Sequence, residues 1–181
     1  MKRFILCLAA LLMMVPAFAQ PKNHPNKIRM EIYEISYEDE GKEFTLFSYQ
    51  DDELNFGYYW GLGRCDRIPG SIITFDQVTE TCLYLGKTLA EAKERLEFLL
   101  AMYNNKVTEG VEIPSRRAIG ENLEENALSK VFYEKNVWGN KHLVAEFPYN
   151  DHINQTYIPR KAIKSTLSGL KFYMKIHPEV E

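Results

Sequence analysis

The chain has 181 residues, of which 45% are hydrophobic and 13% aromatic, and its formal net charge is -3. Loss of Lys2 and Arg3 with the leader described below would take that charge from -3 to -5. Nucleic acid and anionic membrane surfaces are held by clustered Lys and Arg, so an acidic chain without a basic stripe argues against both as partners. The 162 residues that remain of 181 once 19 are removed suit one domain or two small ones.

Residues 1–19 have the pattern of an export signal. Lys2 and Arg3 precede an apolar run from Phe4 to Val15, and Ala17-Phe18-Ala19 supplies the small residues that a signal peptidase needs. The alternative is an amino-terminal membrane anchor, but a span needs about 20 apolar residues and this run is shorter. The sequence therefore predicts a periplasmic or secreted protein with no transmembrane segment after cleavage.

Residues 20–26 are a polar tether, and residues 27–181 are expected to form one α+β domain, with 106–127 as the place where two parts would divide. The apolar alternation of the first strand changes phase between Ile32 and Tyr33, which predicts a β-bulge. Two further strands, within 44–49 and 54–60, complete an antiparallel meander. A Gly- and Pro-rich loop is expected at 61–70.

A buried strand over 81–85 runs directly into a helix at 88–104. Thr88 and Glu91 form a predicted capping box at its start. Asn104-Asn105 is expected to end it, because asparagine tolerates the left-handed conformation. The predicted apolar stripe of this helix consists of Leu89, Ala92, Leu96, Leu99, Leu100 and Tyr103.

The second half of the chain again predicts strands that lead into a helix. A strand at 107–113 is expected to close at Pro114, and 114–127 reads as an irregular, mobile connection. A hairpin follows with its turn at Gly139. Pro159 is expected at the first position of a second helix, 160–175. The predicted fold is therefore α+β: an antiparallel sheet, continuous or split, with both helices packed on one face.

Two cysteines remain after removal of the leader, Cys65 and Cys82. A pair in an oxidising compartment predicts a disulfide, which would stabilise the fold by about 3 kcal/mol. The alternative is two separately buried thiols, because spacing alone does not show that the side chains meet.

No specific catalytic, phosphate-binding or metal motif occurs, so no cofactor is expected. The available acid and base groups are His142, Glu146, Asp151 and His152. On one strand, His142 and Glu146 would share a face about 13 Å apart, too far for a direct hydrogen bond. A cysteine nucleophile beside His152, or a metal held by Asp151 and His152, is a weaker interpretation than a solvated turn.

Aromatic residues are the most suggestive feature. Tyr59, Trp60 and Trp138 could stack on sugar rings or receive a protein, although strand alternation places at least some of them in the core. Arg116 and Arg117 could bind an anion, or could simply be solvated.

The leading hypothesis is a non-catalytic binding module that recognises a glycan or a protein through exposed aromatic side chains. One alternative is a hydrolase with scattered acid and base residues, and another is a structural subunit of an envelope assembly. A short leader followed by one aromatic-rich domain resembles small exported proteins of unknown function from Gram-negative bacteria.

Overall fold

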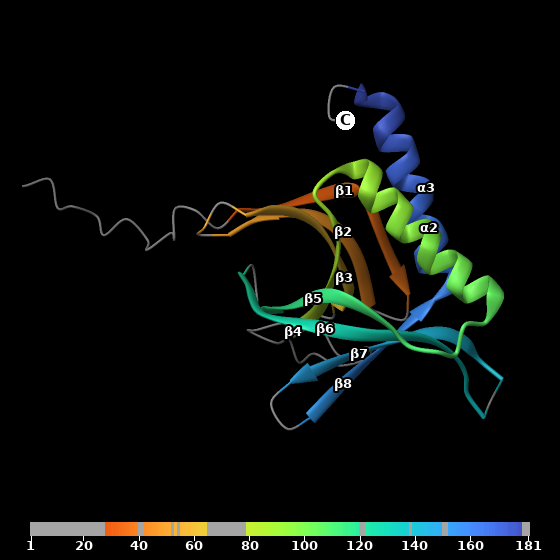
Figure 1. The fold of residues 1–181 in the computed structure, drawn as a ribbon. Helices are drawn as coiled ribbons and strands as arrows, with labels where there is room; N and C mark the ends of the chain where they lie inside the picture. The colour runs from red at the N-terminus through yellow and green to blue at the C-terminus, as the bar shows by residue number, and fades with distance from the viewer. Residues whose placement is uncertain are drawn as a thin grey trace, which may run out of the picture.

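A computed structural model describes residues 28–39, 42–51, 53, 55–64, 79–119, 122–137, 139–149 and 152–178. These residues form one eight-stranded antiparallel sheet, in which each strand pairs with the next along the chain, and two helices (Figure 1). The elements are β1 (Ile28–Asp39), β2 (Lys42–Gln50), β3 (Phe56–Arg64), β4 (Thr79–Gly86), α2 (Leu89–Asn105), β5 (Val111–Ile119), β6 (Asn122–Lys135), β7 (Lys141–Tyr149), β8 (His152–Pro159) and α3 (Arg160–Ile176).

The predicted α+β fold is confirmed, and the sheet is continuous. Four strands lead into α2, and four more lead into α3. The two helices pack on each other, with α2 against β4 and α3 against β1. Figure 1 shows the sheet strongly bent, with β1, β2 and β3 above β5 to β8 and the helices side by side at one end. Because the sheet bends, β8 also approaches β3.

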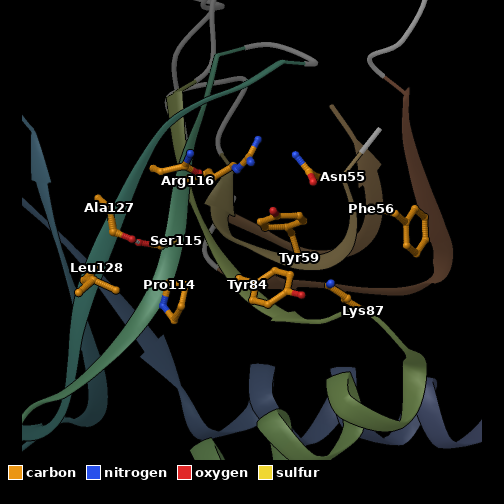
Figure 2. Close-up of a pocket in the computed structure, with 11 residues that line it drawn as sticks. Asn55, Phe56, Tyr59, Tyr84, Lys87, Pro114, Ser115, Arg116, Ala127 and Leu128 are labelled. Carbon is orange, nitrogen blue, oxygen red and sulfur yellow. Dashed lines mark hydrogen bonds between the residues drawn. The ribbon is translucent and has the colours of Figure 1, made fainter. Parts of the chain in front are cut away.

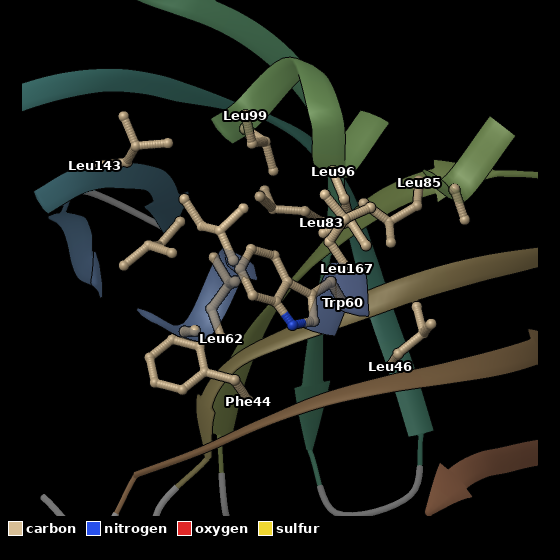
Figure 3. Packing of buried hydrophobic residues seen from close by; sticks show 14 of the residues in the cluster. Phe44, Leu46, Trp60, Leu62, Leu83, Leu85, Leu96, Leu99, Leu143 and Leu167 are labelled. Atoms are coloured by element: carbon tan, nitrogen blue, oxygen red, sulfur yellow. The ribbon is translucent and has the colours of Figure 1, made fainter. Parts of the chain in front are cut away.

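The main core fills the space between the sheet and the helices. Trp60 is completely buried in the middle of this core, and the centroids of the Phe44 and Trp60 rings are 6.0 Å apart (Figure 3). Helix α2 contributes the apolar side chains that its sequence stripe predicted, except that Leu100 and Tyr103 are only partly buried. The buried helix residues are Leu89, Ala92, Leu96, Leu99, Met102, Ala162, Ile163, Thr166, Leu167 and Leu170.

The start of α2 has the predicted cap, with one difference. The Thr88 hydroxyl accepts a hydrogen bond from the Glu91 amide at 3.1 Å, which satisfies one orphan donor of the first turn. The Glu91 carboxylate accepts instead from the amide of Lys87, at 2.6 Å. It reaches one residue beyond the cap because Gly86 leaves room for it: a Cβ at Gly86 would collide with Cβ of Glu91.

The end of α2 differs from the prediction. Asn104 and Asn105 stay helical, and Lys106 takes the left-handed conformation with φ of 54°. The amide of Lys106 bonds the carbonyl of Tyr103, and the next amide bonds that of Met102, which is the pattern of a Schellman motif. The Asn104 side chain has another role, because it accepts two hydrogen bonds from Arg160 at 3.0 and 3.1 Å.

Two local predictions about strands are confirmed. The register of β1 against β2 shifts between Glu31 and Ser36, where the phase of the apolar pattern changes. The turn between β6 and β7 contains Gly139 with φ of 83°, and the Gly139 amide bonds the carbonyl of Asn136 at 2.9 Å.

The loop predicted at 61–70 is wrong in its first four residues, because β3 continues to Arg64. Gly61 allows the Glu80 side chain of β4 to pack closely against the β3 backbone, because a Cβ at position 61 would lie 3.0 Å from both carboxylate oxygens of Glu80. Glycine in a strand often marks such a close approach, so Gly61 is not a loop signal here.

The strand predicted to close at Pro114 instead runs through it to Ile119, and most of the segment expected to be irregular and mobile belongs to β5 and β6. Proline is tolerated in this strand because position 114 pairs only with Leu128 of β6, beyond the last pair with β4. The segment has few apolar residues, so its sequence shows no alternation that would predict these strands.

The second helix begins at Arg160, in agreement with the expected span, but Pro159 is its N-cap and not its first helical residue. The predicted leader and the tether lie outside the described residues. Within the described part of the chain, no helix is both long enough and apolar enough to span a membrane.

Candidate functional site

The candidate site lies where β4 and β5 diverge. These strands pair from Thr79 opposite Ile119 to Leu83 opposite Ser115. Beyond that point β4 continues against β3 as far as Gly86, whereas β5 continues only against β6. Strands β1 to β4 form one arm of the sheet and β5 to β8 form the other. The gap between the two arms, where β4 and β5 separate, is a pocket of about 490 Å³ (Figure 2).

The pocket is lined mainly by apolar and aromatic groups, with a few polar ones at its edges. Figure 2 shows Tyr59 and Tyr84 in the middle, with Arg116 and Asn55 above them. The described lining residues are Asn55, Phe56, Tyr59, Tyr84, Lys87, Pro114, Ser115, Arg116, Asn126, Ala127 and Leu128.

The two tyrosines form part of a second aromatic cluster, on the sheet face away from the helices. The rings of Tyr59 and Tyr84 meet edge to face with centroids 5.3 Å apart, and Phe47 stacks on Tyr59 at 6.0 Å. The Tyr84 ring lies over Gly57, where a Cβ would be 2.6 Å from its Cε2 atom. Glycine at 57 therefore sets the position of the Tyr84 ring in the pocket.

Arg116 is held at the upper edge of the pocket by contacts on two sides. Its Nη2 donates to Oδ2 of Asp51 at 3.2 Å, and only 17% of its side chain is exposed. Its guanidinium carbon is also 5.9 Å from the ring centroids of both Tyr49 and Tyr59, within cation–π range. These contacts fix the planar group in one orientation.

Asp51 accepts more hydrogen bonds than the one from Arg116. Its Oδ1 accepts from the amides of Glu53 and Asn55, and its Oδ2 also accepts from the Asn55 side chain. Burial raises the pKa of Asp51, but the hydrogen bonds from Asn55, Arg116 and Glu53 lower it more, so the net shift is downward. Asp51 is thus ionised near neutral pH, closes the β2–β3 turn and positions Arg116.

The tyrosine hydroxyls of the pocket stay protonated near neutral pH. Burial raises the pKa of the Tyr59 phenol above its usual 10.0, with Arg116 acting in the opposite direction. Burial and the nearby Glu91 carboxylate raise the pKa of Tyr84 as well. Both phenols are therefore neutral hydrogen-bonding groups.

Of the ligand-binding residues predicted from the sequence, the structure brings together Tyr59 and Arg116. Trp60 is in the core and fully buried, so it is not available to a ligand: strand alternation directs it to the opposite face from Tyr59. Arg117 lines a different pocket, between the end of β3 and the middle of β8. Trp138 lies outside the described residues.

The predicted acid and base groups have separate partners. Nε2 of His142 lies 3.6 Å from a carboxylate oxygen of Glu134, and its ring packs on Tyr157. Glu146 accepts a hydrogen bond from Gln155 at 2.9 Å. Asp151 and the side chain of His152 lie outside the described part of the chain. Among the described residues, no three His, Cys, Asp or Glu side chains form a group that could hold a metal ion.

The predicted disulfide stays a prediction, because Cys65 lies outside the described residues. Cys82 is completely buried on β4, and its sulfur is 3.5 Å from a carboxylate oxygen of Glu80.

Sequence reasoning missed most of the pocket. The strand over 81–85 is expected to be buried on both faces, whereas Tyr84 is only partly buried, and nothing local indicates that Lys87, Pro114 and Leu128 surround the same space. The proline within β5 is a partial signal, since it marks a position with one strand neighbour.

No protein-family model, curated protein or solved structure matches this chain.

Proposed function

We propose that this protein is a non-catalytic binding module whose ligand occupies the pocket between β4 and β5. The observation that carries the proposal is the divergence of these strands, which leaves about 490 Å³ lined by aromatic and aliphatic side chains. Ligand sites typically have volumes of about 300–1,000 Å³ and combine apolar walls with a few placed polar groups. This pocket has both, with Arg116 as the polar group whose position its neighbours hold.

The burial of the aromatic residues favours a small ligand over a large partner surface. Tyr59 is 7% exposed and Trp60 is not exposed at all, so together they present little area for a glycan chain or a protein face. Tyr59 contacts a ligand only from within the pocket. A ring-sized group, including a single sugar, can reach it there.

The lining also favours binding over hydrolysis. In the part of the chain that the structure describes, the pocket has no histidine, cysteine or carboxylate in its lining. His142 and Glu146, the groups that the hydrolase alternative needs, have other partners. General acid and base catalysis requires such groups within hydrogen-bond reach of the substrate.

Export is part of this proposal and is supported by the leader, residues 1–19. The protein would act in the periplasm or outside the cell. Amino-terminal sequencing of the exported protein is expected to begin at Gln20, and a retained leader would contradict this part. A measured solution mass tests the envelope-subunit alternative, which requires a stable assembly.

The binding proposal is tested by mapping ring-bearing probes onto the nitrogen-15-labelled mature chain by NMR. Phenol, indole, phenylpropionate and phenylpropionamide are suitable probes. Binding is expected to shift the amide signals of Tyr84, Ser115 and Arg116 and to leave those of α3 in place. If no probe shifts the pocket amides at millimolar concentration, the proposal is wrong.

A further inference from the structure

The charges around the pocket are unlike those of the whole chain. Lys87 and Arg116 are both in its lining, and no carboxylate among the described residues is. Asp51 lies beside Arg116 and offsets one of these charges. The lining itself therefore carries two positive charges, with the carboxylate of Asp51 beside Arg116 and that of Glu91 beside Lys87 and Tyr84, on a protein whose formal charge is -3.

The Arg116 guanidinium has donors to spare. Only its Nη2 atom bonds Asp51, and the described residues provide no acceptor for its other N–H groups. Arginine presents its donors as a rigid planar fork that matches a carboxylate. Since Asp51 and the rings of Tyr49 and Tyr59 hold the plane in place, little side-chain entropy remains to be lost on binding.

Asp51 does not compete for the remaining donors. Its oxygens already accept from Glu53, Asn55 and Arg116. Its negative charge, together with that of Glu91 near Tyr84, repels a doubly charged ligand more than a singly charged one. Charge thus favours a carboxylate over a phosphate dianion.

The rest of the pocket is suited to an apolar body. Tyr59 and Tyr84 present ring surfaces, and Leu128 is 51% exposed on the β6 side. Figure 2 shows these groups below and beside Arg116, so one ligand can contact the cation and the apolar wall together.

We propose that the ligand is a small carboxylic acid with an aromatic or branched apolar body. Its carboxylate accepts hydrogen bonds from Arg116, and its body packs against Tyr59, Tyr84 and Leu128. This inference rests on the proposed binding function and specifies the ligand of that same pocket.

The test compares phenylpropionate with its neutral isostere phenylpropionamide by calorimetric titration of the mature chain at about pH 7. The carboxylate is expected to bind at least about tenfold more tightly, because a charge-assisted hydrogen bond is worth more than a neutral one. Phenyl phosphate, as a dianion, is expected to bind more weakly than phenylpropionate.

Three variants assign the effect to Arg116. Arg116→Gln is expected to remove the preference for the carboxylate, and Arg116→Lys, which keeps the charge beside Asp51 but lacks the fork, to reduce it. Lys164→Gln, which removes one charge from an exposed position on α3, is the matched control and leaves the preference unchanged. If Arg116→Gln fails to fold, the test is whether Arg116→Lys reduces the preference for phenylpropionate over phenylpropionamide.

The outcomes separate the two proposals. Equal binding of acid and amide, both mapped to the pocket, overturns the carboxylate assignment and leaves the binding function standing. Tighter binding of phenyl phosphate, or a preference for the carboxylate that is undiminished in Arg116→Lys, also overturns it. If none of the ring-bearing probes binds, phenol and indole included, both proposals are overturned.

Discussion

Arg116 on β5 and Asp51, directly after β2, are 65 residues apart in the chain, yet their side chains meet at 3.2 Å. The side chains are only 17% and 14% exposed. The pair ties the two arms of the bent sheet together at the edge of the pocket. Removal of one partner from such a pair leaves the other as a largely buried charge without a counter-charge. The stability lost in this way is greater than the net stability that the pair contributes.

Asp51→Asn is expected to destabilise the protein by about 1–3 kcal/mol near pH 7, because hydrogen bonds to a buried charge are lost. The folded pKa of Asp51 is lowered from 3.8, so its contribution is present above about pH 4 and is lost as pH falls through the folded pKa. Urea unfolding of the wild type and of Asp51→Asn should therefore give free energies of unfolding that differ at pH 7 and become equal near pH 2.

The control for this experiment is Glu53→Gln in the same turn, an exposed residue whose replacement changes the charge by the same amount. It is expected to have little effect on stability. A difference between wild type and Asp51→Asn that stays constant down to pH 2 would show that the ionised carboxylate is not responsible.

Gly57→Ala is expected to lower the free energy of unfolding by about 1–3 kcal/mol through overpacking. The added methyl group would lie 2.6 Å from Cε2 of Tyr84, so the ring must move. In a Tyr84→Leu background, which lacks this atom, the same change should cost less. A double-mutant cycle measures this coupling, and additive effects would contradict the steric account.

Thr88→Ala is expected to destabilise the protein by about 1 kcal/mol, because it removes the side-chain acceptor for the Glu91 amide. Thr88→Ser keeps the hydroxyl and should restore nearly all of the loss. Thermal unfolding of the three proteins gives the comparison. Equal destabilisation by Ala and Ser would mean that the threonine methyl group, and not the cap, matters.

Lys106→Gly is expected to stabilise the protein. A residue with a Cβ in the left-handed conformation costs about 1–2 kcal/mol, and the greater freedom of glycine in the unfolded chain offsets about 0.5–1 of that. The net gain should be about 0.5–1 kcal/mol, seen as a higher urea midpoint. Lys106→Ala keeps the φ of 54° and its strain, so an equal gain in that variant would refute the explanation.

The sequence alone determined the elements whose signals are local. The cap at Thr88, the helix stripes, the bulge in β1 and the turn at Gly139 each depend on residues close together in the chain. Backbone hydrogen bonding and side-chain periodicity within one element produce such patterns, so they can be read without knowing what the element packs against.

Only the tertiary structure decided which face of a strand has a partner and where the pocket lies. Trp60 and Tyr59 are adjacent in sequence, but one is in the helix-covered core and the other lines the pocket. The polar run before Ala127 becomes strand because it pairs with β5, and Arg116 becomes a positioned cation because Asp51 reaches it across the sheet. Strand pairing and the divergence of β4 from β5 are contacts between distant residues, so no local pattern encodes them.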